Sequence, residues 1–144
     1  MNATLLDVLQ NANAIEILVR ILADHELGTY STVSVVNCTR DICLNYFLLQ
    51  EIANNIFQAC YNLCRLNKAR QEEAAQAGII SCLKLIIRTS SPLKQFAIPM
   101  LCDLASATKS CRTLLWQNEA FEVYVELLED PYFQVSALEA FLAW

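Results

Sequence analysis

Glycine and proline are scarce in this sequence, and their scarcity excludes several architectures. Two glycines and three prolines among 144 residues exclude collagen-like and linker-like chains and the turn-rich all-β folds. Charged residues are also few, at 17%, whereas hydrophobic residues reach 56%, and that balance excludes an intrinsically disordered chain. The net charge of −5 and the pI near 4.8 argue against a dedicated nucleic-acid binder.

Long apolar runs are absent as well. The mean hydropathy of +0.34 is high, but no uncharged apolar stretch of about 18 residues, the length that suggests a membrane span, occurs. The first ten residues, MNATLLDVLQ, have neither the basic nor the apolar segment of a secretory signal. The sequence therefore predicts a cytoplasmic chain without a membrane partner.

Catalytic motifs are missing too. The glycine-rich phosphate loops, the zinc-protease helix motif and the nucleophile elbow all fail to match. The single histidine, His25, lies in ILADHELGTY, which is expected to be the polar end of a helix followed by Gly28. Glu122, Glu126 and Glu129 recur on one helix face, as solvated residues do. We expect this chain to lack catalytic activity and to need no cofactor.

The sequence holds seven cysteines, at positions 38, 43, 60, 64, 82, 102 and 111. Without a secretory signal they are expected to be reduced thiols, most of them buried as small apolar side chains. Cys60 and Cys64 lie one helical turn apart, but two ligands fall short of the four that a structural zinc site needs. Core packing is the expected role, and a metal site is the less favoured alternative.

Two kinds of helical segment recur along the chain. AIEILVRILAD, GIISCLKLIIR and AFEVYVELLED share one apolar stripe, and the third matches the second from Ile79 to Phe121, an offset of 42 residues. SPLKQFAIPMLCDLA and DPYFQVSALEAFLAW share another pattern, with Pro92 aligned to Pro131. Both prolines are expected in the first turn of a helix, behind a serine or aspartate that can cap it.

The offsets of 39, 41 and 42 residues between such segments describe one repeat of about 40 residues with a short, a middle and a longer third helix. This length and order are typical of armadillo and HEAT repeats. Neighbouring repeats stack because none can bury its apolar face alone. The predicted fold is all-α, an armadillo/HEAT-like right-handed superhelical stack of about three repeats in one domain. The expected repeats span about 1–66, with an insertion, about 67–107 and about 108–144.

Three places carry local expectations. Gly78 should adopt a left-handed conformation where the short helix turns into the next one. Pro99 should kink a third helix that continues beyond it, and a helix broken at Ile98 is the less favoured alternative. Within the insertion at 26–50, residues 26–36 are expected to form a loop, whereas the chain after Arg40 should form one long helix or two.

The core is predicted from apolar residues that recur at helical spacing. Its expected members are Leu18, Leu22, Phe57, Leu63, Ile79, Leu83, Ile86, Leu101, Leu104, Leu115 and Leu128.

Charge is distributed in blocks along the chain. Residues 1–64 carry two basic and six acidic side chains, and residues 65–112 carry eight basic and three acidic ones. Residues 113–144 carry six acidic side chains and no basic one. Such blocks steer charged partners and set their orientation. The alternative interpretation is that solvated helix faces happen to cluster by sign.

NIFQACYNLCRLNKARQEEAAQAGII, followed by SPLKQFAIPMLCDLA and DPYFQVSALEAFLAW, resembles the C-terminal armadillo-type region of fungal septation-initiation and mitotic-exit network protein kinases. These are Ste11-like kinases that act at the spindle pole body. The resemblance covers about residues 54–144. It implies a non-catalytic region of a serine/threonine kinase that docks a Ras-like GTPase, a spindle-pole scaffold or another network partner, or that helps self-association. None of the kinase motifs occurs in this sequence.

Two other classes of interaction protein stay open. A generic armadillo adaptor, such as a nuclear-import receptor, holds an extended peptide with a tryptophan and an asparagine one turn apart on each third helix. Asn62 matches the asparagine, but Gln58 stands one turn before it, and Asp103 follows Pro99 at that spacing. The paired array is therefore missing, which disfavours import-signal binding. A dimerisation module is the other alternative.

The predicted partner surface consists of polar residues on the third helices and on the segment that follows the first of them. Arginine there would give bidentate contacts to carboxylate or phosphate, so we expect an acidic or phosphorylated partner segment. The plainer alternative is that these residues only solvate the helices. The candidates are Gln58, Asn62, Arg65, Lys68, Arg70, Gln95 and Asp103. A second candidate surface is an exposed apolar end formed by Phe141 and Trp144, which no following repeat covers.

Overall fold

Helices account for most of the described chain. The structure is a computed structural model that describes residues 13–30 and 40–144, with the side chains of residues 13–24 and 51–144. Its helices are α2 (Ala14–Tyr30), α3 (Arg40–Cys64), α4 (Lys68–Gln76), α5 (Ile79–Arg88), α6 (Lys94–Ala107), α7 (Lys109–Gln117), α8 (Ala120–Leu127) and α9 (Gln134–Leu142). Within these residues no strand occurs, and none of these helices is long and apolar enough to cross a membrane. The all-α prediction is confirmed.

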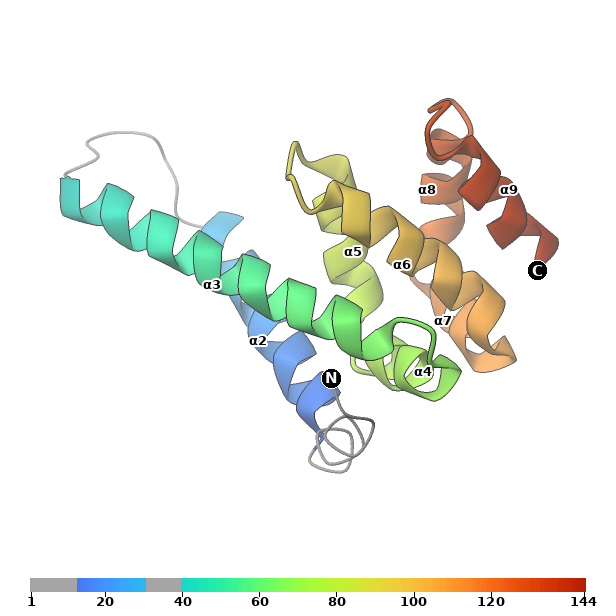
Figure 1. Ribbon diagram of the computed structural model, residues 1–144, viewed down its shortest axis with the longest axis horizontal. Coiled ribbons are helices and arrows are strands. Elements are labelled where there is room, and N and C mark those ends of the chain that lie inside the picture. Colours follow the sequence, from blue (N-terminus) through green and yellow to red (C-terminus); the bar gives the residue numbers. More distant parts are fainter. Residues whose placement is uncertain (1–12, 31–39) are drawn as a thin grey trace.

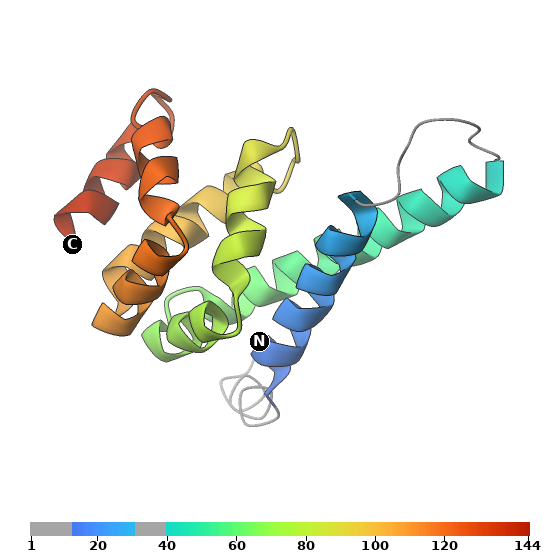
Figure 2. The same cartoon turned by 180° about the vertical axis from the view of Figure 1, so that it is seen from behind.

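The long and middle helices lie in two layers, and the short helices lie along one edge of the stack. Figure 1 shows α3, α6 and α9 across one face, and the reverse view in Figure 2 shows α2, α5 and α8 across the other. The short helices α4 and α7 lie along an edge of the stack, where they pack against each other and against α6. The triplets α4–α6 and α7–α9 meet through α5 with α8 and α6 with α9.

The two triplets repeat one local design at an offset of 41 residues. Asn67 caps α4 by accepting a hydrogen bond from a backbone N–H, and Thr108 caps α7 in the same way; such caps satisfy amides that a helix start leaves unpaired. Gly78 separates α4 from α5 with a φ of +97°, and Glu119 separates α7 from α8 with a φ of +53°. The left-handed turn predicted at Gly78 is confirmed, and Glu119 repeats it without the freedom of glycine.

This register corrects the alignment of the middle helices. The sequence match paired Ile79 with Phe121, whereas the structure pairs Ile79 with Ala120, the first residue of α8. Val123 and Leu127 are buried, and Phe121 and Val125 are exposed. The apolar stripe misled the alignment because α8 is apolar on two faces, only one of which the described residues cover.

The starts of α6 and α9 differ slightly from the expectation. Pro92 and Pro131 lie in turns just before the helices instead of in their first helical turn. The Ser91 hydroxyl accepts a hydrogen bond from the Leu93 amide at 3.2 Å. The Asp130 carboxylate likewise accepts one from the Tyr132 amide at 2.9 Å. These side chains therefore shape the turns and do not cap the helices. Helix α6 continues through Pro99, so the alternative of a break at Ile98 is wrong.

The region of the predicted insertion is more helical than expected. Helix α2 runs through Gly28 to Tyr30, so residues 26–30 are helix where a loop was predicted; a glycine inside a helix costs only about 1 kcal/mol. Residues 31–36 of that loop lie outside the described residues. Of the two alternatives for the chain after Arg40, one long helix is confirmed, since α3 is continuous to Cys64.

The core agrees closely with the apolar spacing. Among the predicted core residues, Leu18 and Leu128 are partly buried and pack against the core. The fully buried ones are Leu22, Phe57, Leu63, Ile79, Leu83, Ile86, Leu101, Leu104 and Leu115. Tyr124 is buried as well, and its hydroxyl donates to the Leu101 carbonyl at 2.6 Å. This bond ties α8 of one triplet to α6 of the other.

Candidate functional site

The predicted partner-binding residues lie on α3, on α6 and on the short segment that follows α3. Gln58 and Asn62 lie on α3, and Gln95 and Asp103 lie on α6, which is beside α3 on the face seen in Figure 1. Arg65 follows α3, and α4 carries the remaining two. The exposed members are Gln58, Asn62, Arg65, Lys68, Gln95 and Asp103.

Arg70 differs from the others because it is buried, with only 5% of its surface exposed. Its guanidinium Nη1 donates to the Leu63 carbonyl at 3.5 Å. Arg112 makes the corresponding bond in the next triplet, donating to the Ala105 carbonyl at 3.1 Å. Both arginines thus satisfy a carbonyl near the C-terminus of the preceding long helix, where a cation also opposes the helix dipole. Arg70 therefore serves the stack and is not accessible to a partner.

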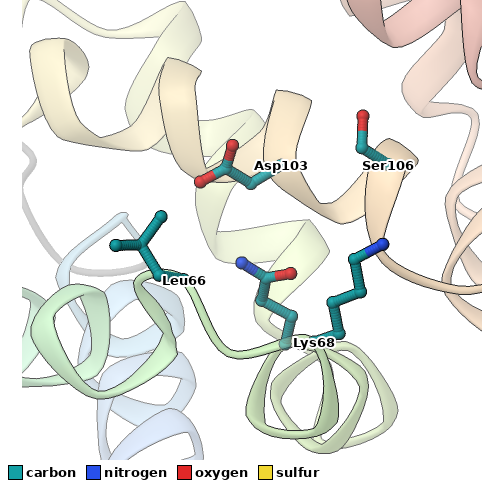
Figure 3. A pocket seen from close by; sticks show the side chains of 5 residues that line it. Leu66, Lys68, Asp103 and Ser106 are labelled. Atoms are coloured by element: carbon teal, nitrogen blue, oxygen red, sulfur yellow. The ribbon is translucent and has the colours of Figure 1, made fainter.

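A surface cavity of about 240 Å³, here called the first groove, lies beside these residues. Its lining residues are Leu66, Lys68, Gln71, Asp103 and Ser106. Figure 3 shows the Lys68 side chain reaching from the start of α4 toward Ser106 near the end of α6, with Asp103 one turn earlier. The groove is therefore bounded by the turn between α3 and α4 on one side and by α6 on the other.

Two features of the first groove distinguish it from an ordinary solvated surface. Leu66 is 90% exposed and has a φ of +60°, a left-handed conformation that is unfavourable for leucine. Partial burial raises the pKa of the Asp103 carboxyl above its usual range, and the nearby charge of Arg65 partly opposes that shift. The groove thus brings an exposed apolar side chain on the turn after α3 close to a carboxyl on α6 that lies near a cation.

A second cavity of about 300 Å³, here called the second groove, lies one repeat further along the edge. Its lining residues are Lys109, Arg112, Thr113, Trp116 and Trp144. Lys109 and Arg112 stand 41 residues after Lys68 and Gln71, so the two grooves occupy equivalent places. Sequence reasoning missed this site. The alignment of Lys68 with Lys109 was the one sequence feature that pointed to an equivalent site in the next repeat. Trp116 and Trp144 are far apart in the sequence, and only the fold brings them together.

Part of the basic block is used inside the stack. Arg88 on α5 pairs with Glu122 at 3.6 Å and with Glu126 at 3.4 Å, both on α8. The amine of Lys84 donates to the Asn118 carbonyl in the turn before α8. These contacts join the basic block of one triplet to the acidic block of the next, which accounts for some of the charge segregation without a partner. Arg65, Lys68 and Lys109 are exposed basic residues of the block.

The predicted apolar end is only partly exposed at the residues chosen for it. Phe141 is half-buried, and its ring lies 5.0 Å from that of Phe121 and 6.1 Å from that of Tyr124. Trp144 is 42% exposed and lies 6.1 Å from Trp116. Leu142, which is 88% exposed, is the more accessible apolar residue of this end.

The thiols in the described part of the chain are buried, and we expect them to be unreactive. Cys60, Cys64, Cys82, Cys102 and Cys111 are buried, and burial raises the pKa of Cys60, Cys64 and Cys102 to about 12. A protonated thiol is neither a nucleophile nor a good metal ligand. In the described part of the chain, no group of three or more histidine, cysteine, aspartate or glutamate residues could hold a metal ion. Cys38 and Cys43 lie outside the described side chains.

The fold and the grooves together define a helical chain of repeated triplets that offers two surface grooves along its edge. No protein-family model matches it, and no solved structure does. Over all 144 residues it is 42% identical to the cytokinesis protein sepH of Aspergillus niger, of which it covers 9%.

Two further relatives match about two thirds of the chain. MAP3K epsilon protein kinase 1 of Arabidopsis thaliana is 45% identical over 93 residues, which are 65% of this chain and 7% of the relative. Cell division control protein 7 of Schizosaccharomyces pombe is 34% identical over 95 residues, 66% of this chain and 9% of the relative. The chain thus spans less than a tenth of these relatives, whose names refer to cytokinesis, cell-division control and a protein kinase.

Proposed function

We propose that this chain is a non-catalytic, protein-binding region of a larger cell-division serine/threonine kinase, folded as an armadillo-type right-handed stack. The repetition of helix triplets at 41 residues supports this class of fold. The similarity to cytokinesis and cell-division proteins and to a protein kinase supports the cellular role. By its resemblance to the septation and mitotic-exit kinases, the partner would be a Ras-like GTPase or a scaffold of the spindle pole body.

The proposed partner segment is acidic or phosphorylated, and one observation carries this proposal. Arg65 and Lys68 are exposed beside the first groove, at the turn that joins α3 to α4. An arginine can hold a carboxylate or phosphate with two parallel hydrogen bonds, and a neighbouring lysine adds a point charge. These two cations lie close in sequence on an otherwise acidic protein, so they would both attract and position such a segment.

The neighbouring residues fit an extended segment. Gln58 and Asn62 on α3 and Gln95 on α6 are exposed, on two helices that lie in the same layer of the stack (Figure 1). Their amides can bond to the backbone of a bound peptide. Asp103 would repel an acidic residue placed beside it, so it would help to set the register of the segment.

The proposal is tested with a synthetic peptide of alternating glutamate and phosphoserine, which probes the charge chemistry directly. Reversal of both cations, Arg65→Glu with Lys68→Glu, should weaken binding about tenfold or more and reduce its salt dependence. Asp103→Asn should tighten binding, because it removes a like charge from the groove. Arg20→Glu, which changes an exposed cation on α2, is the matched control and should have no effect.

Unchanged binding by the doubly reversed variant at low ionic strength would rule out the first groove as the docking site. Sedimentation of the free chain tests the remaining alternative. A dimer at the concentrations used for binding would favour a dimerisation module over a peptide-binding one.

A further inference from the structure

The two grooves form a series along the edge of the stack. Each contains a lysine that is the first residue of a short helix, Lys68 of α4 and Lys109 of α7. Helices α4 and α7 pack side by side, as Figure 2 also shows. A segment that occupies the first groove can therefore reach the second by continuing along the same edge.

The second groove offers a different chemistry from the first. Trp116 is 65% exposed and Trp144 is 42% exposed, and both line the groove. The Arg112 guanidinium is already bonded to the Ala105 carbonyl, so Lys109 is the more available cation. Aromatic walls favour an aromatic or large apolar side chain, and the lysine favours an acidic neighbour of that side chain.

The distance between the grooves sets the spacing of the ligand. Packed helices have axes about 8–10 Å apart, and an extended chain advances about 3.3 Å per residue. Equivalent points on α4 and α7 are therefore separated by about three residues of an extended peptide. Trp116 lies further along α7 than Lys109, which adds about 10 Å along the helix axis. A group held at Lys68 and a ring held at Trp116 are therefore separated by about four residues of an extended peptide.

We propose that the second groove is an aromatic-binding subsite of the proposed partner site. The partner segment places a phosphate or carboxylate at Arg65 and Lys68 and, about four residues away, an aromatic side chain against Trp116 and Trp144. This inference rests on the proposed function and adds to it the composition and spacing of the bound motif.

The test uses acidic peptides with one phosphoserine and one phenylalanine, separated by roughly two to six residues, and a matched peptide without phenylalanine. The chain contains two tryptophans, and both line the second groove, so tryptophan fluorescence reports on this groove alone. The peptide with a spacing of about four residues should bind about tenfold more tightly than the peptide without phenylalanine, and it should shift the tryptophan emission to shorter wavelength. Trp144→Ser should remove that gain and leave binding of the matched peptide unchanged.

The outcomes separate the two proposals. If the matched peptide binds but phenylalanine adds nothing at any spacing, the second subsite is refuted and the proposed function stands. If no peptide binds, both are refuted. A gain from phenylalanine without a fluorescence change would place its binding elsewhere, and would also overturn the subsite.

Discussion

The repeat register makes opposite predictions for two equivalent positions. Gly78 and Glu119 both have left-handed backbone conformations 41 residues apart. A Cβ built on Gly78 meets no atom within 4 Å, so the cost of Gly78→Ala is confined to the backbone. A non-glycine residue in this region costs about 1–2 kcal/mol, of which the lower entropy of the unfolded chain returns about 0.4–1 kcal/mol. Gly78→Ala should therefore destabilise the chain by about 1 kcal/mol.

Glu119→Gly should do the reverse. Removal of the side chain relieves the left-handed strain, and the glycine entropy cost of about 0.5–1 kcal/mol offsets part of that gain. The expected result is a stability between unchanged and about 1 kcal/mol higher. Urea unfolding followed by circular dichroism measures both variants, and comparison requires equal m-values. The equivalence of the two turns would be refuted if Gly78→Ala stabilised the chain. It would also be refuted if Glu119→Gly destabilised the chain by about 1 kcal/mol, the loss expected for Gly78→Ala.

Four further predictions concern the core. Leu83→Ala removes a fully buried side chain and should lower the free energy of unfolding by about 2–5 kcal/mol in the same assay. Tyr124→Phe removes the hydroxyl that donates to Leu101 and should cost about 0.5–1.5 kcal/mol; a neutral effect would show that this bond does not stabilise the packing of the triplets. The five buried thiols should resist iodoacetamide in the native chain and react in urea, as peptide mass spectrometry would report. Because burial raises the pKa of Cys60 from 9.0 to about 12, its contribution to stability should be complete below pH 9 and decline as the pH approaches 12.

The helical architecture was accessible from the sequence because its signals are local. Most of the residues that apolar spacing predicted for the core are buried, and the left-handed turn at Gly78 was predicted from the conformational freedom of glycine. Glu119 gave no such signal, so the apolar stripe of α8 was aligned one residue late. The helical residues after His25 were missed for a similar reason, since Gly28 disfavours a helix locally but the preceding helix continues through it.

The candidate site was accessible only in part because burial of a charged side chain is a tertiary property. Arg65 and Arg70 look alike in sequence, yet one is exposed and the other is bonded beneath the end of α3. The second groove depends on contact between α7 and Trp144, two residues after the end of α9, which no local pattern predicts. Trp144 was identified as exposed and apolar, but its pairing with Trp116 required the fold.

The central claim is that an acidic segment binds in the first groove, between the turn that joins α3 to α4 and the end of α6. Amide chemical-shift mapping of the labelled chain with the glutamate–phosphoserine peptide tests it most directly. The account predicts that the largest shifts fall in the turn between α3 and α4, at Arg65–Gln71, and near the end of α6, at Asp103–Ser106. Shifts concentrated on α2, α5 and α8, the opposite layer of the stack, would contradict it.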